Sequence, residues 1–317
     1  MTELPPIELL APDIGRWRDG DTGVDWVHVI DSGRPGPQVM VQALTHGNEI
    51  CGAIALDWLL QQRFQPRCGR LTLAFANVEA YNRFDPADPF ASRSVDEDYN
   101  RVWADESLFG PRDSVELRRA RQLRPCVDAA DLLLDIHSMS EACSPLMVCG
   151  MVDKNVVYAR ALGMPAHLLI DTGHPAGLRM VDRGAFGDQH SPKRALLIEC
   201  GQHWERATAT VAIDTLLRFL GLTGLADPAW WQPKVQLALP QQQRLVRVTE
   251  AVVARSADFR FLVPTLGLSV IASAGTVIAQ DGDHRWTTPY DAAVLVMPGM
   301  RNLKPGGTAV RLGRFED

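Results

Sequence analysis

Short apolar segments alternate with longer amphipathic segments from about residue 25 to residue 220. The apolar segments are rich in β-branched residues, and several have no polar face, as in strands that helices cover on both sides. The predicted strands span residues 26–30, 38–44, 70–77, 131–137, 145–150, 167–170 and 194–200. Helical periodicity between them predicts helices over residues 49–63, about 112–126, 153–162 and 205–220. This alternation predicts an α/β fold with a mainly parallel mixed sheet flanked by helices.

The pattern changes at the segment GLTGLADPAWWQPK, residues 221–234, where glycine and proline interrupt the helical periodicity. Residues 234–314 contain short predicted strands separated by turn residues. We therefore predict two domains, residues 1–224 and residues 225–317, of which the second is smaller and all-β.

Composition narrows the classes of partner. Of the 317 residues, 46% are hydrophobic and 22% are charged, with a formal net charge of -6 and a pI near 5.8. Nucleic acids and anionic membranes favour proteins with an excess of basic residues, so we expect no nucleic-acid or membrane partner, and a small molecule or peptide instead. The sequence has no apolar run of membrane-spanning length and no signal-peptide pattern, which predicts a cytoplasmic protein. The sequence leaves open whether the protein forms a homo-oligomer.

The six cysteines form no C-x-x-C pair. Several lie inside apolar segments, where free cysteine behaves as a small hydrophobic residue. We expect reduced thiols, and the lack of a close cysteine pair gives little support to a metal role for Cys143, Cys149 or Cys200.

Ionisable residues follow three of the predicted strands. His46 and Glu49 come after the strand 38–44, His137 ends the strand 131–137, and Glu199 ends the strand 194–200. The carboxyl ends of parallel strands share one sheet edge, so these side chains are expected to converge. Two imidazoles and one carboxylate are the ligands of many catalytic zinc sites, which keep one position open. His46, Glu49 and His137 are thus candidate ligands of one Zn²⁺ per chain, and Glu199 remains for proton transfer.

Each of these signals has an ordinary alternative. A single H-x-x-E motif is common by chance, and Asp135 is either a contact of the third ligand or a plain strand-end charge. The polar loop 92–101 holds Arg93, Asn100 and Arg101, and arginine recognises carboxylates and stabilises charge on a carbonyl oxygen. Taken alone, the loop is better explained as a solvated surface segment in which Asp96, Glu97 and Asp98 pair with the arginines.

Four motifs together resemble one known family. THGNE, DYNR, DIHS and IECGQ occur in the order and approximate spacing of the succinylglutamate desuccinylase and aspartoacylase family, which comprises zinc amidohydrolases similar in their catalytic domain to zinc carboxypeptidases. The resemblance covers nearly the whole chain. It implies a zinc carboxypeptidase-like catalytic domain over residues 1–224 and a β-rich capping domain over residues 225–317.

The resemblance also implies roles for individual residues. His46, Glu49 and His137 correspond to the zinc ligands, and Glu199 corresponds to the general base. Arg93 resembles the arginine that steadies the scissile carbonyl oxygen. Two further residues, Asn100 and Arg101, resemble the pair that contacts the acidic part of the substrate.

The chain departs from the family at three places. Tyr99 stands where many members have leucine in the D-L-N-R motif. The arginine that aspartoacylases place before the base-bearing strand has two candidates, Arg179 and Arg183, of which we prefer Arg183 for substrate binding. Tyr290 is the candidate for a substrate-binding tyrosine from the C-terminal domain, which resembles lipoyl and biotin carrier domains without the lysine that carries the cofactor.

These observations predict a zinc-dependent amidohydrolase acting on linear amides, which cleaves a small N-acyl amino acid. A C-terminal domain that narrows access to the zinc favours small substrates over long peptides. One alternative is a metallocarboxypeptidase acting on short peptides, because the same ligands serve both reactions. The other is a non-catalytic protein that binds zinc or a small ligand, although a passive site has no need of Glu199.

Overall fold

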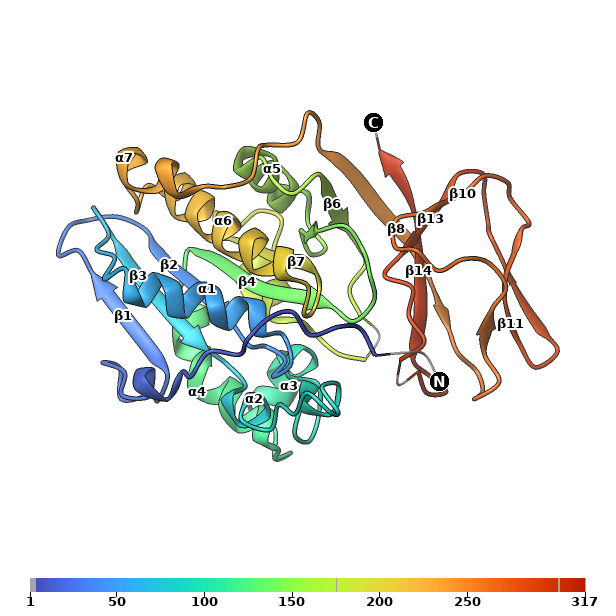
Figure 1. Ribbon diagram of the computed structural model, residues 1–317, viewed down its shortest axis with the longest axis horizontal. Coiled ribbons are helices and arrows are strands. Elements are labelled where there is room, and N and C mark those ends of the chain that lie inside the picture. The colour runs from blue at the N-terminus through green and yellow to red at the C-terminus, as the bar shows by residue number, and fades with distance from the viewer. Residues whose placement is uncertain (1–3, 175, 302, 317) are drawn as a thin grey trace.

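An 11-stranded mixed sheet runs through the computed structural model, which describes residues 4–174, 176–301 and 303–316 (Figure 1). In spatial order its strands are β1 (Val27–Asp31), β3 (Arg70–Phe75), β2 (Gln38–Ala43), β4 (Leu132–Met139), β7 (Arg194–Gln202), β5 (Leu146–Val148), β6 (His167–Ile170), β8 (Arg244–Val253), β14 (Thr308–Glu316), β13 (Ala293–Val296) and β10 (Val270–Ile271).

Strands β3, β2, β4 and β7 are parallel to one another, whereas β1 is antiparallel to β3 and β5 is antiparallel to β7. The carboxyl ends of β2, β4 and β7 therefore lie at one edge. Across the β4/β7 ladder, His137 is the register partner of Glu199. The predicted convergence of these strand ends follows directly from this topology.

Helices cover both faces of the parallel part of the sheet (Figure 1). Helices α1 (Ile50–Gln61), α5 (Asp153–Leu162) and α6 (Arg206–Leu222) pack on one face, and α4 (Val115–Ala129) packs on the other. Successive strand residues alternate between the two cores: Val39 and Val41 of β2 join the first, and Met40 joins the second. The predicted α/β fold class is confirmed, including strands that are apolar on both faces.

Short elements account for most of what the apolar pattern did not predict. Strand β12 (His284–Thr287) pairs with β11 (Val277–Asp281), and β9 (Arg260–Phe261) completes a separate three-stranded antiparallel sheet. The sequence HRWT has one apolar residue, so its alternation is too weak to mark a strand. The short helices α2 (Val78–Tyr81), α3 (Asp105–Leu108) and α7 (Pro228–Trp231) likewise span too few residues to show periodicity.

The main sheet is continuous across the predicted domain boundary. Strand β6 pairs in parallel with β8, with His167 in register with Arg244. The connecting segment is also tied to α6, because the buried carboxylate of Asp214 accepts hydrogen bonds from the backbone N–H groups of Gln236 and Leu237. The division at residue 224 stays a prediction, and the segment after it extends the same sheet.

The structure also bears on two expectations from composition. All six cysteines are free thiols. In the described part of the chain, no helix combines the length and apolar character that crossing a membrane requires.

Candidate metal centre and substrate cavity

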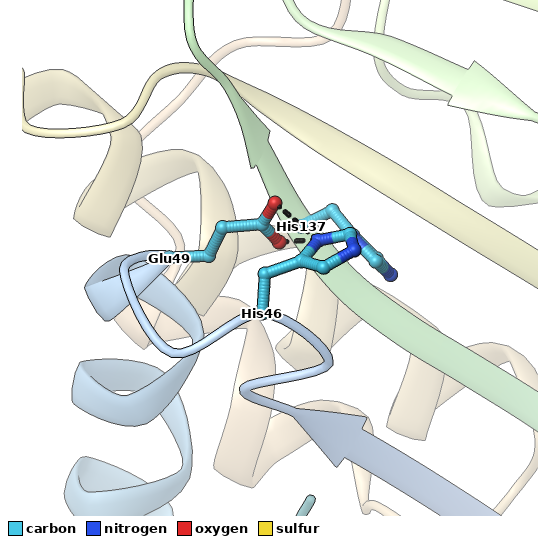
Figure 2. A group of neighbouring side chains, drawn as sticks. All are labelled: His46, Glu49 and His137. Carbon is cyan, nitrogen blue, oxygen red and sulfur yellow. Dashed lines mark hydrogen bonds and ion pairs between the residues drawn. The ribbon is translucent and has the colours of Figure 1, made fainter. Parts of the chain in front are cut away.

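Three side chains meet at the carboxyl edge of the sheet (Figure 2). His46 follows β2, Glu49 directly precedes α1, and His137 belongs to β4. The Nδ1 atom of His46 lies 2.7 Å from Glu49 Oε1, and Nδ1 of His137 lies 2.9 Å from Glu49 Oε2. In the described part of the chain this is the only group of three or more His, Cys, Asp or Glu side chains whose ligand atoms all lie within 4.8 Å of one another.

The far nitrogen of each imidazole faces a second carboxylate. His137 Nε2 lies 2.8 Å from Asp135 Oδ2, and Asp135 in turn accepts a hydrogen bond from the Thr45 hydroxyl. His46 Nε2 lies 3.0 Å from Asp98 Oδ1. Such carboxylates fix the orientation and tautomer of metal-binding histidines. Asp135 is therefore a contact of His137, which decides between its two sequence-based interpretations.

The electrostatics of the group follow from its burial. Burial alone would raise the pKa of Glu49, but the positive charges of His46 and His137 hold that pKa well below its ordinary value. Burial would also lower the pKa of His137, and the adjacent carboxylates Asp135 and Glu49 instead raise it well above its ordinary value. Each charge in the group thus depends on the others.

The donor set fits a zinc ion. Two imidazole nitrogens and a carboxylate oxygen are ligands that zinc prefers, and a three-residue set leaves a position for water or substrate. His46, Glu49 and His137 are 4%, 1% and 1% exposed, so the protein already bears the desolvation of these polar groups.

The loop that carries His46 and Glu49 packs closely on its neighbours at Gly47. A Cβ atom at Gly47 would lie 2.4 Å from backbone atoms of Ala80 and Tyr81, and 2.5 Å from the carbonyl oxygen of Ser92. The φ angle of Gly47 is not in the left-handed region. The requirement for glycine at this position is therefore steric, because no side chain fits here.

Glu199 of β7 faces the same cavity, beside His137. Its Oε2 atom is buried and accepts no hydrogen bond from the described residues. Burial, reinforced by the charge of Glu49, raises the pKa of Glu199 well above its ordinary value, although His137 and Arg93 oppose the shift. A carboxyl group with a raised pKa suits proton transfer near neutral pH.

The loop 92–101 is anchored to the protein core. The buried carboxylate of Glu116 on α4 accepts hydrogen bonds from the backbone N–H groups of Val95, Asp96 and Glu97. This anchor favours the functional interpretation of the loop over the solvated one. It places Arg93 Nη2 at 2.9 Å from Asp98 Oδ2, and Arg93 Nη1 at 3.8 Å from Glu49 Oε1.

A cavity of about 190 Å³ opens from the candidate metal ligands. Its apolar walls include Val148, Leu169 and Leu197. Its polar lining comprises Glu199 and the basic residues Arg93, Arg101, Arg179 and Arg311, with Asn100, Asp171 and His203 among others. The segment after residue 225 provides Gly267, Met297, Pro298, Gly299 and Arg311.

Two candidate substrate-binding residues lie elsewhere. The guanidinium group of Arg183 binds Asp105 at 2.7 Å and Asp128 at 2.8 Å, outside the cavity lining. The hydroxyl group of Tyr290 lies 2.6 Å from Thr249 Oγ1, also outside the lining. Arg179, the less favoured candidate, does line the cavity.

Arg179 is itself paired with protein carboxylates. Its guanidinium donates to both oxygens of Asp171, at 2.8 and 2.6 Å, and to Asp182 at 2.6 Å. Asn100 positions this segment, because its Oδ1 accepts a hydrogen bond from the Met180 N–H group.

Sequence reasoning did not identify Asp98, Arg311 or His203 as parts of the site. Asp98 belongs to an acidic run that composition assigns to the surface, and Arg311 lies in a strand without a motif. Burial lowers the pKa of His203 to about 3, so its ring is neutral. The ring shares a hydrogen bond with the Ser138 hydroxyl, in which either group can be the donor. The HxxE, DYNR, DIHS and IECGQ segments carried the signal for the candidate residues that do line the site.

Comparison with known proteins gives three related findings. A family model of the succinylglutamate desuccinylase/aspartoacylase catalytic domain matches residues 35–220. The chain is 27% identical over 296 residues to a succinylglutamate desuccinylase of Burkholderia lata, an alignment that covers 84% of this chain and 76% of that protein. Solved structures with a similar fold include a succinylglutamate desuccinylase from Vibrio parahaemolyticus and murine aminoacylase 3.

The two structures are similar to this chain over most of their length. The Vibrio structure gives a TM-score of 0.68 at 16% identity, with 92% of this chain and 87% of that chain covered. Murine aminoacylase 3 gives a TM-score of 0.60 at 20% identity, with 89% and 96% covered. The two TM-scores show a shared fold.

The close packing at Gly47 gives a first prediction. Gly47→Ala should lower the free energy of unfolding by about 1 to 3 kcal/mol, because the new methyl group pushes this loop away from the backbone it packs on. The substitution should also weaken zinc binding, because His46 and Glu49 lie on either side of residue 47. Urea unfolding and zinc titration measure the two effects. Gly15→Ala is the control, since the nearest atoms to its Cβ belong to the movable Asp13 side chain. Equal unfolding curves for Gly47→Ala and the parent protein would contradict the steric explanation.

The donor set gives a second prediction. The dialysed protein should retain about one zinc ion per chain, and His46→Asn or His137→Asn should retain almost none, since each substitution removes an imidazole ligand. Metal analysis by mass spectrometry measures the content. His190→Asn, at an exposed histidine, is the matched control. Full zinc content in both ligand variants would show that the metal binds elsewhere.

Proposed function

Because the chain belongs to the succinylglutamate desuccinylase/aspartoacylase family, we propose that it hydrolyses the amide bond of a small N-acyl amino acid, with one Zn²⁺ held by His46, Glu49 and His137. The family comprises zinc-dependent deacylases. The observation that carries the proposal is the buried His-Glu-His group with Glu199 beside it in one cavity. A ligand set with an adjacent carboxyl group suits hydrolysis.

Zinc bound at this group would polarise the substrate carbonyl and lower the pKa of a coordinated water to about 7. The protein holds the ligand set in place through Asp98 and Asp135, which fix the orientation of the two imidazole rings.

Glu199 is the proposed general base and acid. Its carboxylate takes a proton from the attacking water and then gives that proton to the nitrogen of the leaving amine. The raised pKa of Glu199 supports the second step, because it favours the protonated form that donates the proton. Its place beside His137 supports the first, because it faces the same open side of the site.

Arg93 is proposed to stabilise the negative charge that develops on the carbonyl oxygen. Its guanidinium lines the cavity near Glu49 and is held by Asp98. Asp98 also contacts His46, so one carboxylate positions both Arg93 and a candidate metal ligand. Asn100 and Arg101 also line the cavity, where we propose that they contact an acidic group of the substrate.

The size of the cavity favours a small substrate. The cavity has a volume of only about 190 Å³, and one of its walls consists of Gly267, Met297, Pro298, Gly299 and Arg311. A carboxypeptidase needs room for the peptide that precedes the cleaved residue. The small cavity therefore supports a deacylase over a metallocarboxypeptidase. The proposed proton transfer by Glu199 is what separates either enzyme from a non-catalytic binding protein.

A substrate panel tests the proposed reaction. Zinc-loaded protein should release free amino acid from at least one N-acetyl, N-succinyl or N-formyl amino acid with a kcat/KM at least about 10-fold above that for any tripeptide, because a longer chain fits the cavity poorly. Chromatographic measurement of the released amine gives the rates. Faster cleavage of peptides would favour a carboxypeptidase, and zinc binding without any hydrolysis would favour a binding protein.

Glu199→Gln tests the proposed base. The substitution should lower kcat at least about 100-fold, because glutamine cannot exchange the proton, while the zinc content stays unchanged. Glu250→Gln, at an exposed position of β8, is the matched control and should keep the parent rate. A Glu199→Gln variant with near-parent kcat would refute the role of this carboxylate.

A further inference from the structure

Arg311 brings a charge from the C-terminal strands into the cavity. It lies on β14, where its register partners are Val296 of β13 and Ala251 of β8. The residues on either side of it, Val310 and Leu312, are buried in the core of the C-terminal module. Because side chains alternate along a strand, Arg311 points to the opposite face, where it lines the cavity.

The four arginines of the cavity differ in how their charges are balanced. Arg93 is paired with Asp98, and Arg179 is paired with Asp171 and Asp182. Arg101 and Arg311 form no ion pair with any residue in the described ranges 4–174, 176–301 and 303–316. The guanidinium of Arg101 donates to the carbonyl oxygen of Asn100 at 2.6 Å. No described residue accepts a hydrogen bond from the Arg311 side chain.

Arg311 acts on the pKa of Arg101, the other cavity arginine without an ion-pair partner among the described residues. Burial lowers the pKa of Arg101 to about 10. The charge of Asp98 opposes this shift, and the charges of Arg93, Arg179 and Arg311 add to it. Burial also lowers the pKa of Arg311, with Arg179 acting in the same direction and Asp171 and Glu199 opposing. Arg101 and Arg311 line the same cavity, where like charges repel, and an anion that contacts both relieves the repulsion.

The side chains along the sheet indicate what kind of anion fits. Glu199 and Leu197 lie on β7, Val148 on β5 and Leu169 on β6. In the sheet, the strand order is β7, β5, β6, β8 and β14, and Figure 1 shows β6 between β7 and β8. The cavity therefore continues from the candidate metal ligands over an apolar surface to Arg311. That order matches a molecule with an amide at one end, a hydrocarbon portion, and a carboxylate at the other.

We propose that Arg101 and Arg311 together bind a carboxylate of the substrate, so that the C-terminal strand β14 takes part in substrate recognition. The inference rests on the proposed deacylase function and deepens it. Planar guanidinium groups recognise carboxylates through paired N–H donors. The carboxylate belongs either to the amino acid or to a dicarboxylic acyl group, and the experiment distinguishes these two sources.

The experiment compares matched acidic and neutral substrates. One arm pairs an N-acyl amino acid with its α-carboxamide, and the other pairs an N-succinyl amino acid with the N-butyryl derivative. Arg311→Gln should lower kcat/KM for the acidic member of one pair by about 10- to 100-fold, mainly through KM, because a charge-assisted hydrogen bond is lost. The neutral member should change less than about 3-fold. The arm that responds identifies the carboxylate.

Two further variants separate recognition from folding. Arg311→Lys keeps the charge and should retain part of the preference for the acidic substrate. Arg314→Gln, on the same strand with its guanidinium 3.7 Å from the Tyr290 ring centroid, should leave both pairs unchanged. Equal losses on acidic and neutral substrates, or no loss in either arm, would overturn the proposal.

Direct binding keeps this result separate from the proposed function. If no member of the panel is hydrolysed, calorimetric titration of the zinc-loaded protein with the same substrates replaces kcat/KM. Weaker binding of the acidic member alone by Arg311→Gln supports the carboxylate site even if the deacylase proposal has failed. Identical affinities of the parent protein and Arg311→Gln for the acidic members of both arms overturn the carboxylate site.

Discussion

The burial of the Glu49 carboxylate between two imidazole rings is the interaction on which the rest of the site depends. A buried carboxylate is costly unless opposite charge or a metal compensates it. Here the compensation comes from His46 and His137, which belong to segments at the ends of β2 and β4. Each ring is in turn held by a carboxylate, Asp98 or Asp135. None of these groups is stable in its position alone, so the loop, the strand and the start of α1 have to assemble together.

The surrounding structure makes that assembly rigid. The parallel ladder between β4 and β7 fixes Glu199 beside His137, since both residues are register partners in the interior of the sheet. The loop that supplies Arg93 and Asp98 has no regular ladder, and the buried Glu116 replaces one by accepting three backbone N–H groups. A polar loop with its backbone anchored in this way behaves as part of the core. Precision of this kind is what a metal site with a nearby base requires.

The sequence predicts those features that are local or repeat in a motif. Apolar runs predicted the main strands, and the residues at their ends predicted the candidate ligands and Glu199. Pairings between distant segments leave no such signal. Arg179 and Arg183 lie in one short stretch, and only the tertiary structure shows that Arg183 turns to Asp105 and Asp128 while Arg179 faces the cavity. Asp98 looked like a surface charge for the same reason.

The continuity of the sheet gives the C-terminal strands a different role from that of a separate cap. A cap on a flexible linker would set the size of the entrance but would place no side chain reliably within it. Here β8 pairs with β6, and β14 pairs with β8, so hydrogen-bonded ladders connect Arg311 to the strands that carry Leu169 and Glu199. The distance between the two ends of the cavity is then set by strand spacing, which varies little. A cavity whose length is fixed by strand spacing can select a substrate by its length as well as by its charge.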